Sequence, residues 1–227
     1  STNIHAEQKP LIYQIGKHVK LVDDATFCKS IIADGKELIT GEEYGAIRVL
    51  ELKDEKVYIT FKEDLTSLAN AFSGCSALKS IPENLFANCP KATDFSFTFF
   101  GCKALTAIPE GLFANNPKVT IFQGTFSYCS ALKSLPANLF ANNRKVNSFR
   151  LTFSGCSALK SIPEKLFANC PKVNTFFQTF AGCSALKSIP ENLFANNPEV
   201  TEFTGTFSAC SALTAIPENL FASNPAV

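Results

Sequence analysis

The chain has 227 residues, nearly half of them hydrophobic, and a formal net charge of +1. This balance gives no electrostatic attraction to nucleic acid, and no apolar run is long enough to span a bilayer. We therefore expect no nucleic-acid partner and no membrane insertion within this chain. Tryptophan and methionine are absent whereas phenylalanine occurs 22 times, which indicates one Phe-rich motif used repeatedly.

The N-terminal part, residues 1–64, alternates apolar and polar residues as β-strands do. Residues 47–52 and 57–61 flank a charged turn and predict one hairpin. Asp34-Gly35, between residues 29–33 and 36–40, predicts another. Because no Gly-, Ser- or Pro-rich linker follows, we expect a small β-rich cap docked on the next segment; a separate β domain is the alternative. The polar start carries no secretory signal, so any signal peptide or anchor is expected upstream.

From residue 65 onward the sequence repeats every 27 residues without an insertion. The six units are 65–91, 92–118, 119–145, 146–172, 173–199 and 200–226, and Val227 would open a seventh. A fixed period of this length predicts coils that stack, because one unit cannot bury its apolar side chains alone. Positions that hold the same residue type in all six units include those of Phe72, Cys75, Leu78 and Pro82. The C-terminus ends as a coil begins, so we expect this end to continue or to pair.

Each unit contains two short apolar stretches that predict extended segments, such as residues 78–81 and 91–95. Proline at position 82 and its equivalents would end the first, because proline cannot donate a hydrogen bond to the next coil. The intervening E-N-L-F-A-N segment can form one helical turn.

The pattern A/T-F-x-x-C-x-x-L-x-x-I-P followed by V-x-x-F resembles the BspA-like leucine-rich repeats of bacterial surface proteins. The resemblance covers residues 65–227, although this unit is longer than the family's usual one. It implies an α/β leucine-rich-repeat solenoid, strand-rich with short helical turns, in which six repeats follow the N-terminal cap. It also implies an extracellular location on a bacterial cell surface, and adhesion or binding to a host protein.

Nine cysteines raise the question of disulfides or metal sites. Six share one repeat position, and Cys89 and Cys170 occupy a second position that holds Asn116, Asn143, Asn197 and Asn224 in other units. Cysteine and asparagine there would both place a small group inside the coil, so we interpret the cysteines as buried free thiols. No paired metal-ligand spacing, phosphate loop or nucleophile motif occurs. We therefore expect no metal, no cofactor and no catalytic site.

Positions that vary among the six copies predict where a partner binds. Two variable columns flank an inward phenylalanine and should form one exposed stripe. Ile121, Arg150 and Phe177 lie on successive coils of this stripe, and exposed arginine and aromatic residues are typical binding anchors. Phe100 and Tyr128 replace small residues and would form a second patch. Drift on a solvated surface is the alternative interpretation for each of these residues.

Repeated glutamate and lysine columns predict a solvated face with weak pairing between coils. The sequence thus favours a cell-surface protein-binding or adhesion module, with an extracellular or host protein as the expected partner. A structural spacer array is the first alternative. Glycan binding is the second, and the absence of tryptophan weakens it.

Overall fold

The computed structural model describes residues 8–41 and 44–227, so residues 1–7 and 42–43 of the predicted cap lie outside the described residues. Seven strands and one three-residue 3-10 helix occur in the described part. They are β1 (Leu11–Tyr13), β2 (Gly16–Val22), η1 (Ala25–Phe27), β3 (Cys28–Ala33), β4 (Lys36–Glu37), β5 (Ile47–Leu52), β6 (Lys56–Phe61) and β7 (Leu78–Ser80). All except β7 precede the repeats.

The strands form two antiparallel sheets. One has the order β4-β3-β6-β1-β7, and the other pairs β2 with β5. The predicted hairpin at Asp34-Gly35 is confirmed, because β3 and β4 pair across these two residues. Both have positive φ, 49° and 73°, as the tight two-residue turn requires.

The second predicted hairpin is wrong, because β5 pairs with β2 while β6 pairs with β1 and β3. The connection between β5 and β6 explains the difference. The Asp34 carboxylate accepts hydrogen bonds from the amides of Lys53 and Asp54, at 3.2 and 2.7 Å. This contact holds residues 53–55 as a corner between the two sheets, so the chain changes sheet there instead of folding back.

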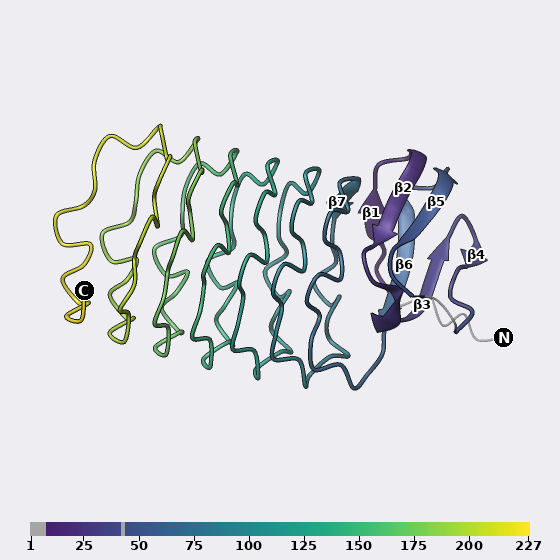
Figure 1. Ribbon diagram of the computed structural model, residues 1–227, viewed down its shortest axis with the longest axis horizontal. Coiled ribbons are helices and arrows are strands. Elements are labelled where there is room, and N and C mark those ends of the chain that lie inside the picture. Colours follow the sequence, from purple (N-terminus) through teal and green to yellow (C-terminus); the bar gives the residue numbers. More distant parts are fainter. Residues whose placement is uncertain (1–7, 42–43) are drawn as a thin grey trace.

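The six repeats stack as successive coils beside these sheets (Figure 1). Parallel backbone bridges join equivalent residues of neighbouring coils, from Ser67 through to Glu202. Amides of one coil donate to carbonyls of the next, for example Phe72 to Thr98 at 2.8 Å and Phe99 to Thr125 at 2.8 Å. The 27-residue period therefore sets the hydrogen-bond register between coils.

The predicted fold class, an α/β leucine-rich-repeat solenoid, is wrong. In the described residues η1 is the one helix, and the repeats hold a single strand, β7. The E-N-L-F-A-N segments form separate turns instead of a helical turn: Leu85, Ala87 and Cys89 each donate to the carbonyl three residues earlier, but the intervening amides do not. Alternate bonding of this kind closes corners without propagating a helix. Elsewhere the extended pieces make isolated parallel bridges.

Phenylalanine rings form the core of the stack. They make two columns of six rings and one of five, which begin at Phe72, Phe86 and Phe95. In the first column successive rings are stacked and nearly parallel, as for Phe99 and Phe126, with centroids 5.5 Å apart and an interplanar angle of 6°. Most of these rings are fully buried. Each coil thus covers the apolar side chains of its neighbours.

The first coil is joined to the N-terminal sheets by backbone and side-chain contacts. Strand β1 pairs with β7 inside the first repeat, and the amide of Gln14 donates to Ala77 at 2.7 Å. The Phe61 ring of β6 lies edge-on to Phe72, with centroids 5.9 Å apart. The sheets therefore cover the apolar end of the first coil.

Replacing one ring of a column should destabilise the protein strongly. For Phe126→Ala we expect the free energy of unfolding to fall by about 3–5 kcal/mol, because a fully buried ring leaves a cavity that neighbouring coils cannot fill. Lys133→Ala, at an exposed position of the same coil, should change it by only about 0.5 kcal/mol. Urea unfolding followed by circular dichroism compares the two. Equal stabilities would show that the rings do not hold the stack together.

Candidate binding surface

The segment between residues 66 and 75, and its equivalents, forms one continuous surface of turns along the stack. Amides at alternate positions donate to the next coil, as Asn70 does to Ser96, while others close turns within the coil, as Ala71 does to Leu68. Side chains at positions 69, 70, 73 and 74 and their equivalents are mostly half-buried or exposed. Those at 68, 72 and 75 are mostly buried. We call the surface formed by these four outer columns the turn face.

Two of the turn-face columns have positive φ in all six coils. The first holds Asn70, Phe97, Gly124, Leu151, Gln178 and Gly205, and the second holds Gly74, Gly101, Tyr128, Gly155, Gly182 and Ala209. Glycine adopts this left-handed conformation freely, whereas a bulky side chain there costs on the order of 1–2 kcal/mol. Phe97, Tyr128 and Leu151 are thus strained substitutions in a backbone that other copies build with glycine.

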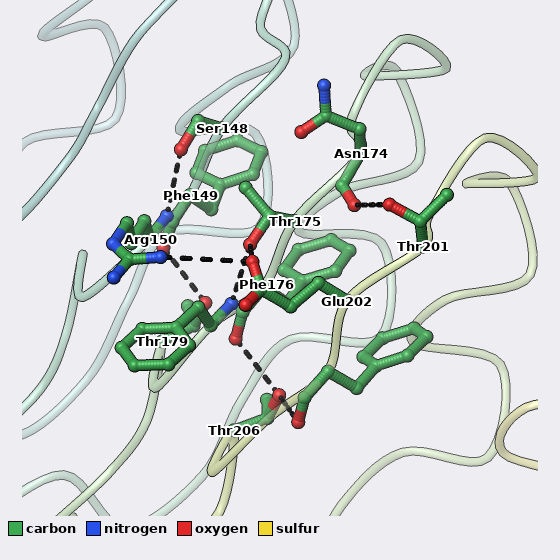
Figure 2. Close-up of polar contacts among 12 residues, drawn as sticks. Ser148, Phe149, Arg150, Asn174, Thr175, Phe176, Thr179, Thr201, Glu202 and Thr206 are labelled. Atoms are coloured by element: carbon green, nitrogen blue, oxygen red, sulfur yellow. Dashed lines mark hydrogen bonds and ion pairs between the residues drawn. The ribbon is translucent and has the colours of Figure 1, made fainter. Parts of the chain in front are cut away.

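Arg150 and Phe177, predicted as one stripe, do contact each other. The Arg150 guanidinium carbon lies 3.8 Å from the centre of the Phe177 ring, on the following coil. The same guanidinium reaches Glu202, one coil further, at 3.8 Å, and Thr175 donates to that carboxylate at 2.7 Å (Figure 2). All of these side chains are half-buried. Arg150 therefore spans three coils and offers the planar face of a guanidinium on an aromatic ring.

Ile121 lies in the other predicted column and is half-buried. Its backbone forms the parallel bridges to Asp94 and Ser148. Although its residue types vary, this column has a structural role at most positions. Side-chain oxygens of Ser67, Asp94, Ser148 and Thr175 each accept a hydrogen bond from the amide two residues later. Ile121 lacks such an oxygen, so it departs from the column's structural role.

Phe100 and Tyr128, predicted as a second patch, are also in contact, with ring centroids 5.5 Å apart and an interplanar angle of 73°. Sequence reasoning missed Phe97, whose ring lies 6.0 Å from that of Phe100. Tyr128 is 54% exposed, the largest value for an aromatic residue of the repeats. The three rings form an aromatic cluster over the second and third coils.

Glycines on the following coil make room for this cluster. A Cβ atom at Gly124 would lie 2.3 Å from the Phe97 ring, and one at Gly155 would lie 2.6 Å from the Tyr128 ring. Phe97 and Tyr128 are thus each followed 27 positions later by a glycine that the ring covers. This offset was a signal in the sequence that could have identified Phe97.

The cysteines are not part of this surface. All nine are buried and free, as predicted, and most thiols of the main column donate to a phenylalanine carbonyl of the preceding coil, as Cys129 does to Phe99 at 3.2 Å. Asn143 donates to Phe113 and Asn116 in the second column, where Cys170 makes the equivalent contacts. The shared role of cysteine and asparagine there is confirmed. No group of three potential metal ligands occurs among the described residues.

Comparisons with known proteins give matches among solved structures only. No protein-family model and no curated protein matches the chain. A leucine-rich repeat protein from Bacteroides ovatus is similar at 23% identity over 74% of this chain and 44% of that one, with a TM-score of 0.38. The structure of the Toll–Spatzle complex from Drosophila is similar at 20% identity over 71% of this chain and 25% of that one, with a TM-score of 0.35.

The chain thus spans less than half of either solved chain. These TM-scores are too low to support the fold. The stacking of the coils is established by the hydrogen bonds and ring contacts between them. Because no family model matches, the resemblance to BspA-like repeats stays a prediction from the motif. Among the described residues, no helix has the length and apolar character needed to cross a bilayer.

The contact between Tyr128 and Gly155 can be measured by a double-mutant cycle. Gly155→Ala should lower the free energy of unfolding by about 2 kcal/mol or more, because the methyl group meets the ring and φ is 75°. In a Tyr128→Gly background only the cost of φ remains, about 1 kcal/mol. Gly182→Ala is the matched control, since its Cβ would meet only backbone of Gly155 at 3.6 Å. Additive effects of Gly155→Ala and Tyr128→Gly would refute the packing.

The buried thiols should make stability fall at alkaline pH. Burial raises the pKa of Cys75 and Cys156 from the usual 9.0 to about 12, and that of Cys129 well above 9.0. A raised folded-state pKa means that the contribution of the protonated thiols is complete below pH 9 and is lost as the pH rises toward 12. We expect Tm to fall across this range in thermal unfolding scans.

A Cys156→Ala variant should show a smaller decrease in Tm across the same pH range. Below that range a thiol reagent should label all nine cysteines only after denaturant is added, because the protonated, buried thiol is a poor nucleophile. Rapid labelling of the folded protein would contradict the burial.

Proposed function

We propose that the repeats form a protein-binding module and that the partner lies against the turn face. The observation that carries this proposal is the aromatic cluster of Phe97, Phe100 and Tyr128. Two of these residues, Phe97 and Tyr128, occupy left-handed positions that glycine fills in two and four of the other coils, and Tyr128 is more than half exposed. Folding gains little from an exposed ring in a strained conformation, whereas strained backbone often accompanies function.

The Arg150–Phe177 pair supports the same surface. Arg150 lies on the fourth coil and Phe177 on the fifth, on the same set of turns as the aromatic cluster of the second and third coils. Arginine and aromatic residues are common in binding hot spots, and here the guanidinium lies on the ring. Together the two groups give the turn face apolar anchors and one fixed cation. A protein partner fits this chemistry better than a small ligand, because the groups are distributed over four coils and do not converge on one pocket.

In full, the proposed role is adhesion or protein binding by an extracellular protein on a bacterial cell surface, with an extracellular or host protein as partner and without catalysis. The motif's resemblance to surface-protein repeats supports the location, and the turn face supports the binding. A structural spacer is the competing role, and the aromatic cluster favours binding, since a spacer does not require it.

The repeats themselves supply the variants that test the proposal. Phe97→Gly, Phe100→Ser and Tyr128→Gly each introduce a residue that equivalent positions of other coils already hold. The triple variant should therefore fold with unchanged or higher Tm, and it should lose binding. A second variant, Arg150→Ala with Phe177→Ala, tests the other group. Ser134→Ala with Ser161→Ala is the control, because alanine occurs at the equivalent Ala107 and these serines lie outside the turn face.

The measurement is a binding screen of the immobilised chain against extracellular-matrix and plasma proteins. Saturable binding that the triple variant weakens by about tenfold or more, and that the serine control retains, supports the proposal. A partner that binds the triple variant and the Arg150 variant as tightly as the unmodified chain would move the site away from the turn face. Absence of binding across the panel would favour the spacer.

A further inference from the structure

A row of lysines lies a few residues beyond the turn face on three successive coils. Lys133, Lys160 and Lys187 occupy the same position on three successive coils and are exposed. Their backbones are in direct contact: the amide of Lys160 donates to the carbonyl of Lys133, and that of Lys187 to Lys160, each at 3.4 Å. Hydrogen-bonded neighbours of this kind lie roughly 4.8 Å apart. Three like charges therefore start from one closely spaced line along the stack.

The glutamates expected to neutralise this row are engaged elsewhere. Glu164 accepts a hydrogen bond from the side-chain amide of Asn192 at 3.0 Å, and Glu191 accepts one from Asn219 at 3.1 Å, each from the following coil. The predicted lysine–glutamate pairing between coils is therefore wrong for these residues. None of the three lysines forms an ion pair with an acidic residue of the described ranges 8–41 and 44–227.

A second lysine column forms ion pairs with acidic residues at its two ends. There Lys91 pairs with Asp64 at 2.6 Å and Lys172 pairs with Glu199 at 3.1 Å, each across one coil. An acidic residue thus ends that column on both sides. The row of Lys133, Lys160 and Lys187 has no such partner, although stacked like charges repel one another.

The side chains beside the row define what could bind it. Ser134, Ser161 and Ser188 follow the three lysines and are exposed, so each coil offers one ammonium group and one hydroxyl. No aromatic ring occurs in either column, which removes the stacking platform typical of single-stranded nucleic-acid sites. A linear polymer with regularly spaced anionic groups and hydroxyls matches this arrangement in charge, hydrogen bonding and direction.

We propose that Lys133, Lys160 and Lys187, with the serines beside them, bind a linear acidic polysaccharide that lies along the stack. Recognition by charge and hydroxyl groups does not need the aromatic rings on which neutral sugars stack. The overall charge of +1 conceals this site, because the acidic residues that balance it lie in residues 1–64 or in other columns of the repeats. This site is independent of the turn face, so one can fail while the other stands.

The test measures binding of heparin, as the linear sulfated polysaccharide, by titration calorimetry at low and at physiological salt. Lys133→Gln/Lys160→Gln/Lys187→Gln should weaken binding by about tenfold or more and reduce its salt dependence, because three fewer counterion-releasing contacts form. The matched control, Lys118→Gln/Arg144→Gln/Lys145→Gln, removes the same charge from exposed positions elsewhere on the coils and should bind within about twofold of the unmodified chain. The Phe97→Gly/Phe100→Ser/Tyr128→Gly variant should also retain binding.

Four results would overturn the proposal. They are no measurable heparin binding, equal losses in the Lys133 triple variant and its matched control, equal binding of neutral dextran, and tighter binding of a single-stranded oligonucleotide than of heparin at the same salt. Circular dichroism of the Lys133 triple variant and of its matched control checks that each is folded. Since all six substitutions lie at exposed positions, we expect unchanged spectra.

Discussion

The structure depends on the backbone hydrogen bonds between successive coils. A coil has no sheet or helix of its own to satisfy its amides, so the donors of one coil need the carbonyls of the next, as Phe72 needs Thr98. This requirement fixes the 27-residue period, and the period in turn places phenylalanine over phenylalanine. Polar satisfaction and apolar burial are therefore met by the same register, and neither is available to an isolated repeat.

The stacking of the coils, the burial of the phenylalanine and cysteine columns, and the turn at Asp34-Gly35 could be predicted from the sequence. A strict repeat reports which residues share an environment, because equivalent positions carry the same side chain in every copy. Local backbone conformation was less accessible. The turns around Phe86 were expected to include one helical turn, but in the structure alternate amides close separate turns at the corner of the coil.

The candidate site shows the same division. The contacts of Arg150 with Phe177 and of Phe100 with Tyr128 follow from adjacency in the repeat, and comparing the copies was sufficient to find them. Phe97 was missed because its column contains five residue types and so suggests no rule. The rule is a positive φ at every member, which is a property of the backbone and is visible in the sequence only through the glycines of that column.

Side-chain donors in the core point in the direction opposite to many of the backbone donors. Thr98 donates to Leu68, Cys129 to Phe99 and Asn143 to Phe113, in each case a residue of the preceding coil. A one-residue insertion would break these bonds on both sides of the altered coil, whereas duplication or deletion of a complete unit would break none. The length of such a molecule therefore changes in whole coils, which are gained by duplication or lost by deletion of a complete unit. Each added coil would lengthen every surface column by one residue.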